Sequence, residues 1–494
     1  MKKTIKFFGA SILAHKSQIA KIFLFLLVFL FTFILRASGY ERVPEYGHLE
    51  ELQYGWAGIN LVETGSPVSW NPNPREIEKK NIIYSGPISD EGKQTTVHVT
   101  LVKPFLEEPP LFSLLVGYTS HLFGADRTKI ISPAYLRFPM IFIAAATSIL
   151  IFFLGRKLFG YWIGLLAMLF FGTIPIFLFS SRFAIPENLI AFFYILSILL
   201  VVYFLEKPRI WLFLPLLFLP GLAGLAKPTG FLIAPFVSFL LLKKDFWRHA
   251  IVILLALLPF IAIFLIYGFH FDAKLFGEVL RTQGTRPVGW SALTFILATP
   301  AFDIKWFFDG WYMFFLLAAL FFLIQPAQDK NIKLLAFACL YWILVVIFSG
   351  GEQDLLPWYR FPMFPFLAIL GVLLIREFFQ KPDFFRTSIL VGFFFSARYY
   401  LSNPFRPNVT PNMFRFYFLL LVLPSLAYLV WKKKWLLWLM QAIIIFVLVA
   451  GTFLNSKLIY SYFPISCESL KCPIGVSTTL GRLYFPILWR ILGP

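Results

Sequence analysis

Long apolar runs separated by short polar stretches fill most of this 494-residue chain. A helix that crosses the hydrocarbon core of a bilayer needs about 20 mostly apolar residues, so each run is a candidate transmembrane helix. The runs fall near residues 22–36, 133–154, 161–180, 188–205, 210–225, 230–242, 250–268, 311–325, 333–349, 362–376, 386–397, 413–431 and 435–454. Some, within 210–242 and 386–397, are shorter than a full span. We therefore predict an all-α polytopic membrane protein with about 13 transmembrane helices, an odd number.

The composition excludes a soluble globular enzyme. Hydrophobic residues make up 59% of the chain and charged residues only 14%, against about 25% charged in an ordinary soluble domain. The mean hydropathy is +0.77. So much apolar surface can be buried only in lipid, and the bilayer is the first partner that the sequence predicts.

The net charge of +19 is interpreted as a topology signal. Lys and Arg collect in the cytoplasmic loops of membrane proteins, and here they cluster at every second gap between apolar runs. The clusters lie at residues 2–21, 156–157, 207–209, 243–248, 330–333, 376–386 and 432–434. This pattern predicts a cytoplasmic N-terminus and an extracytoplasmic C-terminus, and it argues against nucleic acid as a partner.

The first apolar run follows a basic stretch, as the apolar segment of a signal peptide does. No small-x-small cleavage site precedes Arg36, and further spans follow. We therefore expect a retained first transmembrane helix, with a signal peptide as the alternative.

The longest polar connection, residues 36–132, is expected on the outer side, where long loops often carry function. Residues 50–64 have apolar side chains at helical spacing and end at Gly65, which predicts an amphipathic helix on the membrane surface. Pro109-Pro110 predicts the start of a second surface helix that runs to about Phe123. Between them, residues 81–105 alternate apolar and polar side chains around Asp90-Glu91-Gly92, which predicts a small β-hairpin.

Further outer segments are predicted at residues 270–310, at residues 349–361 and in the tail from Asn455. The tail contains Cys467 and Cys472. Two cysteines this close can form a disulfide in an oxidising compartment, and two free thiols are the alternative. Cys339 falls inside a predicted span.

Acidic residues are scarce, and two doublets fall where the predicted surface helices begin. Glu50-Glu51 starts the first helix, and Glu107-Glu108 directly precedes the second. Acidic residues stabilise the N-terminus of a helix and are usually solvated there. The spacing alone therefore leaves helix capping and chemistry both open.

The residues around these doublets resemble a known family. The stretch from Glu50 through Tyr54 to Gly65, followed by the segment from Phe105 to Leu111, is similar to the first outer loop of dolichyl-phosphate-mannose-protein mannosyltransferases and lipid A aminoarabinose transferases, which are GT-C glycosyltransferases. Other segments resemble the family in the same order, namely residues 137–139, 154–160, 181–187, 224–230 and 359–362. The ordered set spans roughly residues 30–375, and it implies a GT-C fold whose first extracytoplasmic loop contributes the active site.

Three positions depart from the family pattern. Glu50 and Glu187 stand where the family commonly has Asp, so the carboxylate is kept on a longer side chain. Glu108 stands where the aminoarabinose transferases have a Lys that acts on the lipid phosphate. A carboxylate cannot replace that cation, so another cation must take its place or the donor is held differently.

The resemblance implies transfer of a sugar from a polyprenyl-phosphate-linked donor to an acceptor hydroxyl, with inversion at the anomeric carbon. The leaving phosphate is stable as an anion, so one base that takes the acceptor proton suffices, whereas glycoside hydrolysis normally uses two carboxylates. The resemblance assigns the catalytic doublet to Glu50-Glu51, with Glu50 as the base. Cations aimed at the leaving phosphate lower the barrier, and Arg binds phosphate with two donors. Arg360, Lys227 and Arg137 are the predicted phosphate ligands, with anchoring at the membrane interface as the alternative.

Other residues are predicted to line the site: Tyr54, Glu107, Glu108 and His270. No cofactor is required by this chemistry. In some relatives a His and a Glu at such positions lie near a divalent metal, but Glu107 and His270 do not have the spacing of metal ligands here. A metal is therefore kept only as an alternative.

The sequence as a whole predicts a GT-C catalytic transmembrane module over residues 1–380, followed by C-terminal transmembrane helices and an extracytoplasmic tail over residues 381–494. We expect a multi-pass glycosyltransferase of the plasma membrane, a hexosyl- or pentosyltransferase whose acceptor is a protein, a lipid or a glycan. Two alternatives stay open: a transporter or flippase of lipid-linked saccharides, and an inactive relative that binds a lipid-linked sugar. Transporters commonly show internal repeats and ionisable groups at mid-membrane, and neither is apparent in the sequence.

Overall fold

The computed structural model describes residues 2–41, 43, 44, 48–89, 96–290, 293, 309–325, 329–349, 357–395 and 410–461. The helices of the bundle are α1 (Lys2–Ala37), α4 (Pro133–Phe159), α5 (Tyr161–Thr173), α6 (Pro175–Ser180), α7 (Pro186–Glu206), α8 (Ile210–Ala226), α9 (Ile233–Leu242), α10 (Trp247–Leu255), α11 (Leu258–Gly284), α13 (Gly310–Ile324), α14 (Lys330–Ser349), α15 (Phe364–Gln380), α16 (Phe384–Phe395), α17 (Pro411–Trp431) and α18 (Lys434–Ser461). Two short 3-10 helices connect them, η2 (Pro228–Leu232) and η3 (Pro357–Met363).

The structure confirms a polytopic helical protein. In the part of the chain that the structure describes, each of the predicted apolar runs coincides with one helix or with two consecutive helices. Within the described residues, eight helical stretches are long and apolar enough to cross a membrane: residues 18–37, 133–159, 186–206, 247–284, 330–349, 358–380, 412–431 and 434–460. Five shorter apolar helices complete the set. The number of helices that cross the bilayer, and the side on which each terminus lies, stay predictions.

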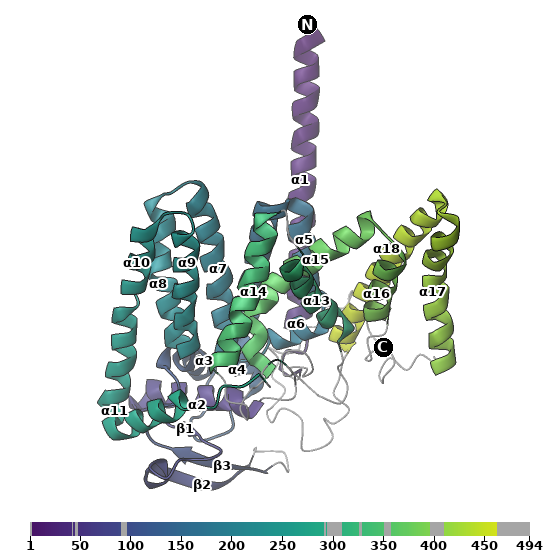
Figure 1. Cartoon of the computed structure of the whole chain (residues 1–494). Helices are drawn as coiled ribbons and strands as arrows, with labels where there is room; N and C mark the ends of the chain where they lie inside the picture. Colours follow the sequence, from purple (N-terminus) through teal and green to yellow (C-terminus); the bar gives the residue numbers. More distant parts are fainter. Residues whose placement is uncertain are drawn as a thin grey trace.

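The elements of the long loop that the sequence predicts on the outer side form a layer at one end of the bundle (Figure 1). This layer contains α2 (His48–Thr64), α3 (Pro110–Leu122), η1 (Glu78–Asn81) and a small sheet of β1 (Ser69–Trp70), β2 (Ile82–Ser89) and β3 (Thr96–Val102). The N-terminal part of α1 projects from the opposite end, where the basic turns between α9 and α10 and between α17 and α18 also lie (Figure 1). The basic turns and the loop layer thus lie at opposite ends of the spans, as the charge pattern predicts.

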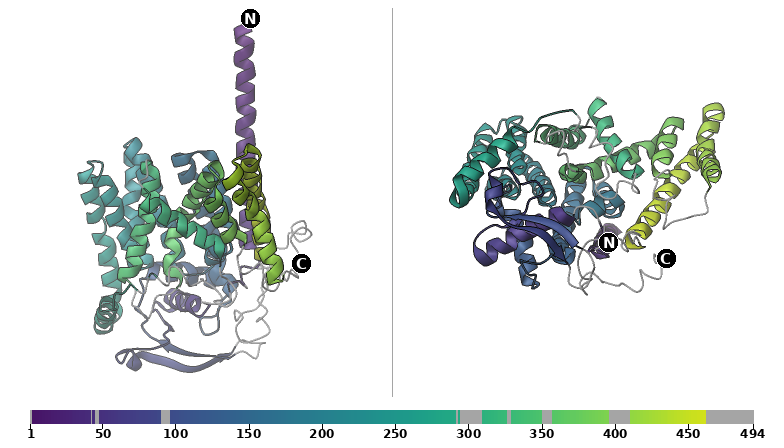
Figure 2. Two further views of the ribbon diagram at one scale, coloured as in Figure 1. Left: turned by 45° about the vertical axis from the view of Figure 1, so that its right-hand side comes forward. Right: turned by 90° about the horizontal axis from the view of Figure 1, so that it is seen from below.

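The predicted hairpin is confirmed. Strands β2 and β3 pair antiparallel, from Ile82 opposite Val102 to Ser89 opposite Thr96, with a bulge between Ile82 and Tyr84. The short strand β1 adds to the other edge of β3, so the strand order is β1-β3-β2. The predicted turn residues, 90–92, lie outside the described part of the chain. Viewed from below, the sheet lies across the helical layer (Figure 2).

Both predicted loop helices are confirmed. However, α2 is not an amphipathic surface helix with one solvent-exposed face. All residues from 51 to 60 are buried, on every side of the helix. Gly58 and Gly117 explain how α2 and α3 come so close, because a Cβ built on Gly58 would lie 1.7 Å from the Ser113 carbonyl oxygen and one on Gly117 would lie 2.3 Å from the Gly58 carbonyl carbon. The two backbones are in contact, and α3 covers the side of α2 that the sequence predicted to face water.

The last helices pack beside the rest of the bundle. Helices α16, α17 and α18 contact one another. In addition, α16 contacts α13, and α18 contacts α5. Trp311 on α13 stacks on Phe394 of α16 with ring centroids 4.0 Å apart. In Figure 2 these helices form one side of the molecule, away from the loop layer under α8 to α11. The division into two modules at residue 380 stays a prediction.

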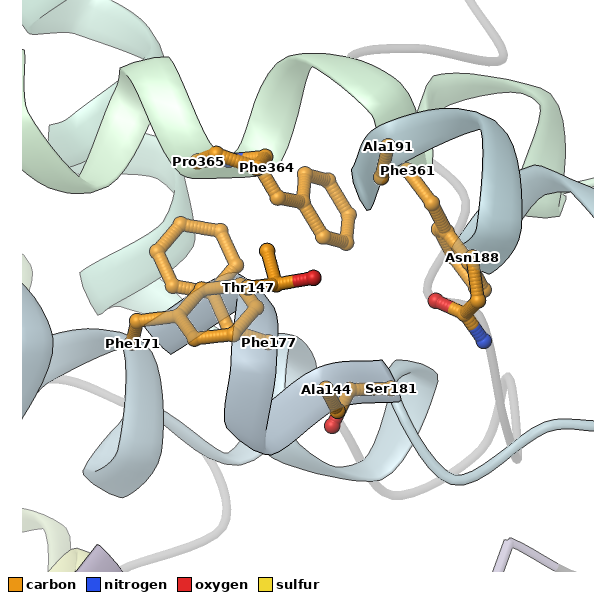
Figure 3. Close-up of a pocket in the computed structure, with 10 residues that line it drawn as sticks. All are labelled: Ala144, Thr147, Phe171, Phe177, Ser181, Asn188, Ala191, Phe361, Phe364 and Pro365. Atoms are coloured by element: carbon orange, nitrogen blue, oxygen red, sulfur yellow. The ribbon is translucent and has the colours of Figure 1, made fainter. Parts of the chain in front are cut away.

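A small cavity lies inside the bundle, where α4, α6, α7 and α15 meet (Figure 3). Its wall is formed by the rings of Phe171, Phe177, Phe361 and Phe364, the small side chains of Ala144, Ala191 and Pro365, and the polar groups of Thr147, Ser181 and Asn188. It has room for little more than one water molecule, so it is a packing defect rather than a substrate site.

Candidate active site

Prolines at three helix boundaries set the backbone around the site. Glu108 precedes Pro109-Pro110, which start α3, and Glu187 follows Pro186 in the first turn of α7. Lys227 lies between α8 and η2 with an extended backbone (φ −160°, ψ 141°). A residue before proline is driven out of the helical region, so Pro228 ends α8 at this lysine. Each of the three charged side chains thus stands at the end of a helix and not along its side.

These three side chains form one cluster. The ammonium of Lys227 donates to Glu187 Oε1 at 2.6 Å, and it lies 3.8 Å from Glu108 Oε1. The ring of Tyr359 lies beside the same ammonium, 4.3 Å from Nζ to the ring centroid. Glu187 is 2% exposed and Lys227 8%. A lysine next to two carboxylates and an aromatic face is strongly held.

Tyr54 on α2 extends the cluster toward the first loop. It is buried, and its ring meets the edge of Phe112 on α3 with centroids 5.2 Å apart. Burial raises the pKa of Tyr54, and the nearby charges of Glu108, Glu187 and Glu50 raise it further. The Tyr54 hydroxyl therefore stays protonated and able to donate a hydrogen bond. Glu50, which is half-buried, thus acts electrostatically on the same tyrosine as Glu108 and Glu187.

Glu51 faces the other way and is a poor candidate for a catalytic group. Its carboxylate accepts from Arg137, Nε to Oε1 at 2.8 Å and Nη2 to Oε2 at 2.6 Å, and Oε1 also accepts from the backbone N–H of Ala184 at 2.7 Å. Both side chains of the ion pair are fully buried. A carboxylate saturated by a guanidinium and shielded from solvent is poorly placed to take a proton from an acceptor, so this geometry favours Glu50 over Glu51 as the base. The catalytic role of the doublet stays a prediction.

Arg137 is likewise committed to protein groups. Besides Glu51, it donates to the carbonyl oxygens of Tyr40 at 3.0 Å and Pro44 at 2.7 Å. These contacts tie the segment after α1 to α4 and leave the guanidinium no approach to a lipid phosphate. The predicted phosphate role of Arg137 is not supported by this geometry. Arg182 similarly donates to the carbonyl oxygens of Leu35 and Arg36 at the end of α1, and to those of Ser38 and Val43 in the segment that follows.

Arg360 lies next to Tyr359 in the chain but contacts a different helix. Its guanidinium stacks on the ring of Tyr312 on α13, 4.8 Å from Cζ to the centroid, and it is 2% exposed. The backbone of Tyr359 is fixed separately, because its carbonyl accepts from Trp342 Nε1 at 2.7 Å. The structure thus brings Tyr359 to the Lys227 cluster, and Arg360 to α13.

Arg286 and Tyr359 are site residues that the sequence reasoning missed. Arg286 follows α11 in the loop that leads toward residue 290, and its charge lowers the pKa of Glu108. No motif distinguishes this arginine from the other basic residues of the chain. Tyr359 is the neighbour of a predicted ligand, and helical geometry turns adjacent residues to different faces.

Glu107 belongs to a network on the sheet side of the loop. It accepts from Arg75 Nη1 at 2.7 Å, and the same nitrogen donates to Glu78 Oε1 at 3.1 Å. Asn71 Nδ2 donates to both carboxylates, at 3.1 Å to Glu78 Oε2 and 3.3 Å to Glu107 Oε1. Glu107 therefore holds the start of α3 to the segment between β1 and η1, one residue away from the cluster that contains Glu108.

His270 stands apart on α11, exposed and with its ring against Phe271. Within the described ranges, no three His, Cys, Asp or Glu side chains come together as metal ligands. Cys339 is a buried free thiol, in the span where the sequence placed it. Cys467 and Cys472 lie outside the described residues, so their disulfide stays a prediction.

Comparisons with known proteins show which fold this architecture represents. A family model for dolichyl-phosphate-mannose-protein mannosyltransferases matches residues 107–267, about a third of the chain, which includes Glu108, Glu187 and Lys227. The solved structure of ArnT from Cupriavidus metallidurans bound to undecaprenyl phosphate superposes with a TM-score of 0.52 at 14% sequence identity, over 89% of this chain and 77% of ArnT. The chain has the GT-C glycosyltransferase fold. The predicted GT-C fold and the resemblance to this family are confirmed.

Two other GT-C proteins are more distantly similar. The oligosaccharyltransferase AglB from Archaeoglobus fulgidus gives a TM-score of 0.44 at 12% identity, over 87% of this chain, which spans only 56% of AglB. The Pmt1-Pmt2 complex of S. cerevisiae gives 0.34 at 15% identity, over 53% of this chain and 33% of the relative. None of the curated proteins is significantly similar in sequence.

Proposed function

We propose that this GT-C protein transfers a sugar from a polyprenyl-phosphate-linked donor to an acceptor hydroxyl at the extracytoplasmic face of the plasma membrane, with inversion of the anomeric carbon. The observation that supports this most directly is the cluster around Glu108. The ammonium of Lys227 lies 3.8 Å from its carboxylate, Arg286 acts on the same carboxylate, and both Glu108 and the half-buried Glu50 act electrostatically on Tyr54. A base and a cationic phosphate site are the two parts that this reaction needs.

Each part has a separate task. Glu50 takes the proton from the acceptor hydroxyl as that oxygen attacks the anomeric carbon. The bond between the sugar and the phosphate oxygen breaks, and the electron pair stays on the phosphate. Lys227 and Arg286 stabilise the charge that grows on the phosphate in the transition state. No metal or other cofactor takes part in these steps as proposed.

Other predicted residues support the site without touching the donor. The buried pair of Glu51 and Arg137 fixes α2, and thereby the position of Glu50. The Ala184 N–H that binds Glu51 lies three residues before Glu187, so the same carboxylate also orients the start of α7. Arg360 is assigned to holding η3 against Tyr312, which presents Tyr359 to Lys227.

The donor class rests on the family match and on the fold shared with ArnT, whose structure contains undecaprenyl phosphate. The test is to incubate the purified protein with a radiolabelled undecaprenyl-phosphate sugar and with peptide, lipid A and oligosaccharide acceptors in separate reactions. Labelled product with one acceptor class, together with release of undecaprenyl phosphate, is the expected outcome. A flippase would instead move the intact lipid between the leaflets of a liposome, and an inactive relative would bind the lipid without cleaving it.

A further inference from the structure

Glu108 and Glu187 share one ammonium, and the sharing is unequal. Lys227 Nζ lies 2.6 Å from Glu187 Oε1 but 3.8 Å from Glu108 Oε1, which is too long for a hydrogen bond. The second oxygen of each carboxylate, Oε2, is buried and has no hydrogen-bond partner among the residues that the structure describes. Glu108 is thus a partly buried carboxylate, 18% exposed, with one enclosed oxygen and a charge that is only partly compensated.

A carboxylate with an enclosed oxygen that accepts no hydrogen bond is costly when it is ionised, and a proton relieves that cost. Burial raises the pKa of Glu108 to about 7, with Glu187 and Glu107 acting in the same direction and Lys227 and Arg286 opposing it. The neutral form has an O–H group where the ionised form has an unsatisfied oxygen. Near neutral pH, Glu108 can therefore act as a hydrogen-bond donor.

The charged and titratable groups around Glu108 come from several elements. Lys227 reaches it from the α8–η2 junction, Glu187 from α7, Arg286 from the loop after α11 and Tyr54 from α2, while Glu107 is its neighbour in the chain. The carboxylate of Glu107 is bound to Arg75 on the sheet side. The two cations that attract a phosphate, Lys227 and Arg286, both act on Glu108 itself.

We propose that neutral Glu108 binds the phosphate of the donor directly, its carboxyl O–H donating to a non-bridging phosphate oxygen beside Lys227. This inference rests on the proposed function. The donor is a phosphodiester with one negative charge, so ionised Glu108 repels it and neutral Glu108 attracts it. Donor affinity then depends on pH, and Glu108 is the residue that sets this dependence.

The test uses a probe whose own charge does not change with pH. Undecaprenyl methyl phosphate is a phosphodiester like the donor, carries a single charge from pH 5 to 9 and has no sugar to lose. Its Kd is measured for the full-length protein in nanodiscs across that range. For the native protein we expect a constant Kd below about pH 6 and a weakening of about tenfold for each pH unit above about 7, because the neutral fraction of Glu108 falls by that factor.

Substitutions test whether Glu108, and not another titrating group, causes the pH dependence of the Kd. Glu108→Gln keeps a hydrogen-bond donor of the same shape, so its Kd should stay within about threefold of the native low-pH value and should not change with pH. Glu108→Ala should also be independent of pH but should bind about tenfold more weakly, since one hydrogen bond is missing. Glu63→Gln is the matched control, because Glu63 lies in the same loop and pairs with His121 and Arg127 instead. It should follow the native curve.

The outcomes distinguish this inference from the proposed function. A native Kd that does not change with pH, in a protein that transfers sugar, would overturn the role of Glu108 and leave the proposed function intact. The same holds if Glu108→Gln keeps the native pH slope. If the folded native protein binds the diester at no pH and transfers no sugar, both proposals are wrong. Thermal unfolding of each variant verifies that it is folded.

Discussion

Glu51 on α2 and Arg137 on α4 form an ion pair that solvent does not reach, with 2.6 Å between Oε2 and Nη2 and neither side chain exposed. The pair joins the first outer loop to the transmembrane bundle. Its carboxylate also binds the backbone before α7. The position of Glu50 relative to Glu187 and Lys227 thus depends on a residue that takes no part in the chemistry.

Glu51→Gln should strongly destabilise the protein. The substitution keeps the shape but leaves the buried guanidinium of Arg137 without a counter-charge, and breaking a buried pair in this way costs about 3–5 kcal/mol. The measurement is thermal unfolding in detergent, with Glu63→Gln as the control. An unfolding temperature within error of the native value would show that the pair does not hold α2.

The contact between α2 and α3 should not tolerate a methyl group. Gly58→Ala places its Cβ 1.7 Å from the Ser113 carbonyl oxygen, so the two helices must separate. We expect a loss of stability and of transfer activity together, since Tyr54 packs on Phe112 across the same interface. Gly277→Ala is the control, because nothing lies within 4 Å of its Cβ position and alanine favours the helix. A Gly58→Ala protein as stable as Gly277→Ala would contradict the close packing.

The helices of this fold could be predicted from the distribution of apolar, basic and proline residues along the sequence. Apolar runs bounded by basic loops give the spans, and Pro110, Pro133 and Pro186 each begin a helix at its first turn, as proline prefers. The hairpin is visible in the alternation along residues 81–105. What the pattern could not show is how deeply α2 is buried, because glycine at positions 58 and 117 carries no periodic signal and the covering helix comes from elsewhere in the chain.

The site was only partly predictable. Tyr54, Glu108 and Lys227 were identified from the family resemblance, and the structure brings them together. The sequence could not show which of Glu50 and Glu51 pairs with Arg137 and which is left for the site, since both are acidic residues in the first turn of one helix. It also gave no reason to single out Arg286, whose charge acts on Glu108. A long-range contact such as Glu51 with Arg137 depends on how α2 packs on α4, which no local pattern encodes.

Lys227→Met should weaken donor binding and abolish efficient transfer. It removes the cation between Glu108 and Glu187, and loss of one partner of a buried charge pair costs about 2–4 kcal/mol of binding, or roughly 30- to 1000-fold in Kd. The measurement is the Kd for undecaprenyl phosphate. Lys79→Met serves as the control, because Lys79 is an exposed lysine of the same loop paired with Glu76. Equal binding by the two variants would exclude Lys227 from the phosphate site.

Protein stability should also depend on the protonation of Glu108. Its folded-state pKa of about 7 lies above the ordinary value of 4.5, so the folded protein binds the proton more tightly than the unfolded chain does. This contribution is fully present below about pH 4.5 and is lost as the pH rises through 7. Compared with Glu108→Gln, the native protein should lose up to about 3 kcal/mol between pH 5 and pH 8. Parallel unfolding curves of the two proteins over that range would contradict the assignment.

The most direct test of the central claim is the rate of sugar transfer by Glu50→Gln, with donor binding measured on the same preparation. Removing the base should lower the rate by about 10²- to 10⁴-fold and leave the Kd for undecaprenyl phosphate unchanged. Glu50→Asp keeps a carboxylate and introduces the residue that is common in the family, so it should retain most of the activity. Full transfer by a folded Glu50→Gln protein would show that Glu50 is not the base and that the reaction proposed for this site is wrong.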